Sequence, residues 1–217
     1  MGYREELTCR AVLAVFALLM SLTGCVTNQG RVANGNYVAP LNNFSMALPR
    51  PALGSLQIRD ESDPEGGAVS FLDDVGNNQG VTYALLPDKA AEAHRDPTKR
   101  DAIYRSFVHD YALPSLFIPI SSRSRIVREE FLDGDQGRSY FAVVVIPEAS
   151  SLVDAQSGKR SDSVRALLVF DAKRFIYMIH ADMVTAFSTI NVDSLTDKEI
   201  GAARDRVQSL RASMRIL

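Results

Sequence analysis

The sequence predicts an α+β domain, with a mostly antiparallel sheet built of hairpins and two helices, one in the middle and one at the C-terminus, packed on it. Two observations predict this class. Short strand-like segments come in pairs around turns, as hairpins do. Two longer segments repeat apolar residues at steps of three and four, the spacing of amphipathic helices. The order strands, helix, strands, helix therefore favours helices layered on an antiparallel sheet.

The first part of the chain supplies short strands and one clear hairpin. The expected segments are a strand at 43–48, a strand at 55–59, a turn at 60–67, and a hairpin of 68–72 with 81–86. Pro49 and Pro51 end the first strand, because proline cannot donate a ladder hydrogen bond. Residues 73–80 between the hairpin strands are rich in Asp, Asn and Gly, which are typical turn residues.

The middle helix is expected from Asp96 to about Ala112. Asp96 is a favoured capping residue, and Pro97 suits the first turn of a helix. Pro114 is expected to end it. The apolar stripe predicted to face the sheet consists of Ile103, Phe107 and Tyr111, with Tyr104 and Val108 beside them.

The second half predicts two more hairpins and the closing helix. The expected strands are 125–132, 138–146, 164–170 and 175–180. Residues 139–146 are apolar on both faces, which predicts a central strand. Thr196 and Glu199 match a capping box at the start of the closing helix. Its apolar seam is Ile200, Ala203, Val207, Leu210 and Met214.

The first 25 residues carry the clearest functional signal. Residues 11–20 form an apolar run too short to cross a bilayer, which takes about 20 residues, but suited to the core of a signal peptide. The sequence Leu22-Thr23-Gly24-Cys25 follows and resembles the lipobox of bacterial lipoproteins. The resemblance implies cleavage before Cys25 and lipid attachment to this residue. An ordinary secretory signal and an uncleaved apolar start are the alternatives.

This resemblance divides the chain into three parts. They are a signal peptide at 1–24, the lipidated Cys25 with a flexible tether at 25–36, and a single domain at 37–217. It implies a protein of the cell envelope whose acylated Cys25 is bound to membrane lipid. Val26 stands where Asp would retain a lipoprotein at the inner membrane, so the expected location is the outer membrane, facing the periplasm.

Composition excludes several classes of function. The net charge of −2 offers no basic surface for a nucleic-acid partner. Cys9 and Cys25 are the only cysteines, so removal of the signal peptide and lipidation would leave the domain without a thiol or a disulfide. Thiol redox and thiol hydrolase chemistry are thereby excluded. We expect no cofactor.

Two acidic turns are the candidates for a cation site. Asp133 and Asp135 begin like a calcium loop, but Gly137 and Val144 stand where further oxygen ligands belong, which excludes an EF-hand. The second turn holds Asp73, Asp74, Asn77 and Asn78. The two turns would form one site only if they converge. Turn chemistry explains both, and no bound metal is expected.

No catalytic motif is found. Glu129 and Glu130 are neighbours on a strand and should point to opposite faces, so they are poorly placed to act together as acid and base. The three histidines, His94, His109 and His180, lack the four-residue spacing of a zinc-binding helix. His180 is expected to be a partly buried edge residue. The nucleophile elbow Gly-x-Ser-x-Gly is also absent.

Two basic segments are weaker candidates for anion binding. Ser157-Gly158-Lys159-Arg160 lacks the other residues of a phosphate-binding loop, which favours a flexible surface loop. The cluster of Arg123, Arg125 and Arg128 has the charge to meet anionic lipid headgroups. The neighbouring Glu129 and Glu130 are expected to neutralise this cluster.

The order of the elements resembles the PsbP-like α/β/α sandwich. The resemblance rests on the strand Phe44-Ser45 ending before Pro49, then hairpins, a middle helix and a closing helix ending near Ser213. The Gly-Trp pair that often follows this first strand is missing. The leading hypothesis is a non-enzymatic envelope lipoprotein that binds a partner protein or an envelope component. The alternative is an envelope enzyme or a carrier of a small ligand or cation, with a site formed by residues distant in sequence.

Overall fold

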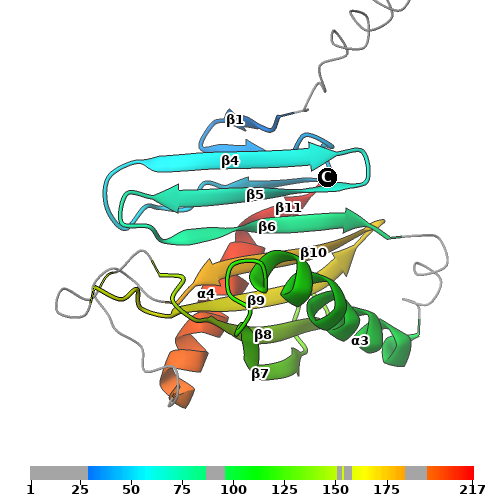
Figure 1. Ribbon diagram of the computed structural model, residues 1–217. Helices are drawn as coiled ribbons and strands as arrows, with labels where there is room; N and C mark the ends of the chain where they lie inside the picture. Colours follow the sequence, from blue (N-terminus) through cyan, green and yellow to red (C-terminus); the bar gives the residue numbers. More distant parts are fainter. Residues whose placement is uncertain (1–28, 87–95, 151–152, 154–157, 184–194) are drawn as a thin grey trace, which may run out of the picture.

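Two antiparallel sheets form the centre of the computed structural model, which describes residues 29–86, 96–150, 153, 158–183 and 195–217 (Figure 1). The large sheet has seven strands in the order β4-β5-β6-β10-β9-β8-β7. The small sheet has four strands in the order β1-β2-β3-β11. The predicted α+β class, with antiparallel hairpins and two helical segments, is therefore confirmed.

Hairpins build most of the large sheet. Its strands are β4 (Leu56–Asp63), β5 (Gly66–Asp73), β6 (Asn78–Leu85), β7 (Arg125–Leu132), β8 (Ser139–Ile146), β9 (Ser163–Ala172) and β10 (Phe175–Asp182). The two halves of the sheet are joined by β6 and β10, where Tyr83 pairs with Tyr177. Every residue of β8 is buried, which confirms that it is an interior strand covered on both faces.

The small sheet extends the ordered fold beyond the expected start of the domain at residue 37, and it adds a strand after the closing helix. Its strands are β1 (Arg31–Ala33), β2 (Asn36–Val38), β3 (Phe44–Ala47) and β11 (Met214–Ile216). The expected tether at 25–36 is wrong for its last residues, because β1 pairs with β2 across Asn34 and Gly35. Both turn residues have positive φ, of 52° and 75°, which Asn and Gly tolerate in a tight hairpin.

The middle helix changes its hydrogen-bond ladder halfway along. The segment α3 (Pro97–Ser106) is an α-helix whose Asp96 cap accepts a hydrogen bond from the Thr98 backbone N–H at 3.0 Å. The next segment, η1 (Phe107–Phe117), is a π-helix. Pro114 lies inside η1, so the prediction that it ends the helix is wrong. The backbone N–H of Ile118 bonds the carbonyl of Leu113, five residues back.

The helices cover opposite faces of the large sheet (Figure 1). On one face, Tyr104, Val108, Ala112 and Phe117 pack against residues such as Tyr140 and Val144. The other face packs against the small sheet and against α4 (Asp197–Ser213). None of the helices in the described ranges combines the length and the apolar character that crossing a bilayer requires.

The closing helix α4 is docked on the domain. Its predicted capping box is present, with Thr196 accepting from the Glu199 backbone N–H at 3.2 Å. Ile200, Ala203 and Val207 are buried, as the seam predicted. The seam stops short of Met214, which lies in β11 and pairs with Met46 of β3. This pairing ties the end of the chain to the small sheet.

Candidate functional site

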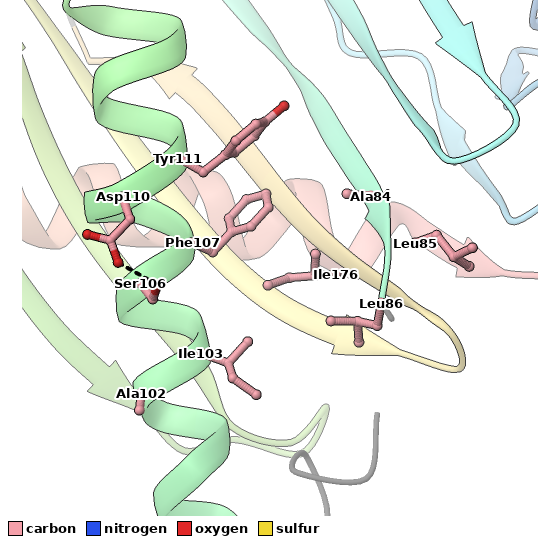
Figure 2. Close-up of a pocket in the computed structure, with 10 residues that line it drawn as sticks. All are labelled: Ala84, Leu85, Leu86, Ala102, Ile103, Ser106, Phe107, Asp110, Tyr111 and Ile176. Carbon is pink, nitrogen blue, oxygen red and sulfur yellow. Dashed lines mark hydrogen bonds between the residues drawn. The ribbon is translucent and has the colours of Figure 1, made fainter. Parts of the chain in front are cut away.

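The side chains of the middle helix and of β6 enclose an open apolar groove of about 520 Å³ (Figure 2). Ile103, Phe107 and Tyr111 point from the helix toward the sheet, as Figure 2 shows. The opposite side consists of residues 84–86 at the end of β6 and Ile176 of β10. We call this space the η1–β6 groove. Its volume lies in the range of small-ligand and side-chain binding sites.

One apolar row of the middle helix lines the groove and continues from the α-helical into the π-helical segment. The stripe predicted to face the sheet is confirmed for Tyr104 and Val108, which are buried, and Ile103 and Phe107 are partly buried against the same core. It is wrong for Tyr111, which is 45% exposed. The buried residues of the helical segment are Tyr104, Val108, Ala112 and Phe117. Phe107 and Tyr111 instead pack against each other, with ring centroids 5.2 Å apart. Together they form the wall of the groove.

A second hollow of about 660 Å³ continues the groove across β4, β5 and β6. Ala84 and Tyr111 line both spaces. The floor of this hollow consists of small residues, notably Ala68 of β5, whose short side chains leave the space open. Gly66 is required there, because a Cβ at this position would lie 2.5 Å from the carbonyl oxygen of Tyr83. We call this space the β4–β6 hollow.

Acidic side chains border the β4–β6 hollow. Glu61 and Asp63 lie on β4, and Glu65 lies in the turn that follows. Asp63 accepts hydrogen bonds from the backbone N–H groups of Glu65 and Gly66, at 2.7 and 2.9 Å, which shape the turn. The two connected spaces thus combine an apolar wall with a negatively charged rim.

The two acidic turns predicted as cation candidates lie at opposite ends of the large sheet. The Asn78 backbone N–H donates to Asp182 at 2.9 Å, which places the Asp73 turn beside the end of β10. The Asp133 turn lies at the start of β8, whereas the end of β8 is level with Asp182, because Ile146 pairs with Ser163. The two turns therefore do not converge. Across the described ranges, no three His, Cys, Asp or Glu side chains are placed to share a metal ion.

In each acidic turn, an aspartate is hydrogen-bonded or ion-paired to neighbouring residues of this chain. Burial alone would raise the pKa of the Asp73 carboxyl, but hydrogen bonds from Asn77 and from the backbone N–H groups of Ala52 and Val75 together lower it. Asp133 forms an ion pair with Arg138 at 2.8 Å. Arg138 also pairs with Asp101 of α3 at 2.6 Å. These contacts give both turns a structural role.

Glu129 and Glu130 point to opposite faces of β7, as predicted, and each pairs with a helical segment. Glu129 accepts hydrogen bonds from Tyr140 and contacts His109 of η1 at 2.8 Å. The bond from Tyr140 outweighs burial and, with His109, lowers the pKa of the Glu129 carboxyl. Glu130 pairs with Arg204 of α4. These side chains line neither hollow, so they tie the helices to the sheet.

The neutralisation of the basic cluster by these glutamates remains a prediction, since both glutamates contact the helical segments. Arg123 pairs with Glu148, at 2.7 Å. In the other basic segment, Arg160 forms an isolated bridge with Val153. Ser157 lies outside the described residues, as do Cys25 and His94. The lipid attachment predicted at Cys25 therefore remains a prediction.

His180 is a buried interior residue and not the expected edge residue. It lies on β10 between β6 and β9, and its side chain is 7% exposed. Its Nε2 has no hydrogen-bond partner. Burial, together with the positive charge of Arg165, lowers its pKa to about 3. Arg165 is itself paired with Asp182 at 2.8 Å. His180 is thus held as a neutral imidazole.

Sequence comparisons give this chain no family. No protein-family model matches it. No curated protein matches it either. Among solved structures, it is similar to the solution structure of cyanobacterial PsbP (CyanoP) from Synechocystis sp. PCC 6803, with 12% identity and a TM-score of 0.46. The match covers 89% of this chain and 100% of that one. A similarity this distant carries no inference about function, and the fold class rests on the sheets and helices of this chain.

Proposed function

We propose that this protein is a non-enzymatic envelope lipoprotein, tethered by acylated Cys25 to the outer membrane on its periplasmic side, that binds a segment of a partner protein. The single observation that supports binding is the η1–β6 groove. Its walls are apolar and open, and they lie beside a filled core. Open apolar surfaces of this kind are typical of binding sites.

The chemistry of the lining favours binding over catalysis. Among the described lining residues of the η1–β6 groove, Asp110 is the only charged one, and it is hydrogen-bonded to Ser106. A single carboxylate supplies no acid and base pair for proton transfer. The aromatic rings of Phe107 and Tyr111 are instead the kind of side chain that anchors a protein interface.

The proposed tether keeps the domain near the bilayer. Arg31, the first residue of β1, is six positions after Cys25, and an extended chain spans at most about 3.6 Å per residue, or roughly 20 Å here. The Gly30 backbone N–H donates to Asp60 of β4, which fixes the start of β1 against the large sheet. A partner of this domain would therefore be a protein held at the same membrane surface.

Two measurements test this proposal. Cys25→Ala should abolish palmitate labelling and leave an unprocessed precursor, whereas normal processing and membrane retention would contradict the lipoprotein assignment. A photo-crosslinking amino acid at Tyr111 in intact envelopes should give one adduct of defined mass. The same amino acid at Leu53, which is 57% exposed and remote from the lining, is the control. Equal adducts at both positions, or none at Tyr111, would contradict partner binding in the groove.

A further inference from the structure

The two connected spaces present one continuous binding surface. The helical wall supplies Phe107, Tyr111 and Leu116, and the floor supplies Ala68 and other small residues of the sheet. Tyr111 lines both spaces. A peptide with an apolar side chain in the η1–β6 groove can therefore place a residue a few positions along at the acidic rim of the β4–β6 hollow.

Among the residues that the structure describes, every charged side chain that lines these spaces is acidic. The four carboxylates are Glu61, Asp63, Glu65 and Asp110. All four residues are exposed. Within the described part of the chain, none of them forms an ion pair, although Asp63 and Asp110 accept local hydrogen bonds. Arg59, the nearest arginine along β4, lines neither space. The described part of the rim therefore carries a net negative charge.

We propose that the occupant is a segment of a partner protein that carries apolar and basic side chains together. The inference rests on the proposed function, in which the groove receives a partner segment, and it adds the chemistry of that segment. Apolar residues fill the space against Phe107 and Tyr111, while Lys or Arg residues reach the carboxylates of β4 and its turn. Opposite charges at the rim raise the association rate and reject acidic competitors.

The test uses three fluorescent peptides of about 15 residues, long enough to form a helix. Each has leucine on one face, and the other face carries lysine, glutamine or glutamate. The mature protein is held in nanodiscs of neutral phosphatidylcholine, with empty nanodiscs as a blank. Fluorescence anisotropy gives Kd at low salt and at about 0.5 M salt, where exposed charges are strongly screened.

The proposal predicts the order lysine, glutamine, glutamate, from the tightest to the weakest. Glu61→Gln combined with Glu65→Gln should weaken the lysine peptide by about threefold to tenfold and leave the glutamine peptide unchanged. The matched control removes two exposed carboxylates remote from the groove, by Asp135→Asn with Asp205→Asn. Tyr111→Ser should weaken the lysine and glutamine peptides alike, and Leu53→Ser should not.

The outcomes separate this inference from the proposed function. If the glutamine peptide binds as tightly as the lysine peptide and both depend on Tyr111, the groove binds apolar segments and the charge proposal is overturned. If the lysine peptide binds equally well to the Glu61 and Glu65 variant and to its control, binding occurs elsewhere and the proposal is also overturned. If no peptide depends on Tyr111, partner binding in the groove itself fails.

Discussion

His180 should make this fold sensitive to mild acid. Its imidazole is neutral in the folded protein, where burial and the nearby Arg165 lower the pKa from 6.5 to about 3. Above pH 6.5 the imidazole is neutral in both states and leaves stability unaffected. Below pH 6.5 the unfolded chain takes up a proton that the folded chain cannot, so stability falls as pH falls toward 3. The loss is about 1.4 kcal/mol per pH unit, or about 2 kcal/mol between pH 7 and pH 5.

Urea unfolding at several pH values measures this loss, and the signal is far-ultraviolet circular dichroism, since the chain has no Trp. The variant His180→Gln removes the titrating ring and retains a polar side chain. The difference in unfolding free energy between the two proteins should change by about 2 kcal/mol from pH 7 to pH 5. Carboxylates titrate in both proteins and cancel in this difference. An equal acid loss in the wild type and the variant would refute the burial argument, whatever the variant's stability at pH 7.

Three further predictions concern the docking of α4, its N-terminal cap and the close backbone contact at Gly80, and urea unfolding tests each of them. Val207→Ala should lower the free energy of unfolding by about 2 kcal/mol if α4 is docked, because Val207 is fully buried. The control Gln208→Ala, at an exposed position of the same helix, should change it by less than about 0.5 kcal/mol. Equal small effects of both substitutions would mean that the helix is not docked. Thr196→Ala should cost about 1 kcal/mol by removing the cap, and Thr196→Ser should restore most of it. Gly80→Ala should lower the free energy of unfolding by about 1–3 kcal/mol, because the added Cβ would lie 2.0 Å from the Val69 carbonyl oxygen. A variant as stable as the wild type would contradict this close approach of the two backbones.

The elements predicted well from the sequence are those whose signal is local. The limits of β7 and the core of β8 follow from an apolar run and a turn rich in Gly and Asp. The capping box of α4 needs only Thr196 and Glu199, three residues apart. These signals depend on neighbouring residues, so tertiary contacts did not override them.

Sequence patterns miss the strands at the two ends of the chain, and the turn expected at 60–67 is wrong, because β4 reaches Asp63 and β5 begins at Gly66. The pair Asn34-Gly35 is a strong hairpin signal, but the polar residues around it favour a tether in the sequence alone. The strand β11 has three residues and follows a helix without a break. Its existence depends on pairing with β3, about 170 residues earlier in the chain. A pattern of neighbouring residues carries no information about such a pairing.

The groove could not be predicted from the sequence, because the ladder of the middle helix changes from α to π at Phe107. An α-helix places residues four apart on one face, so Ile103, Phe107 and Tyr111 predicted a buried stripe. A proline ring inside an α-helix clashes with the carbonyl four residues back and lacks the N–H of the ladder. The segment η1 nevertheless continues through Pro114 as a π-helix, in which residues four apart no longer share one face as they do in an α-helix. Tyr111 lies on this segment and is 45% exposed, so the wall that it forms with Phe107 is open to a partner.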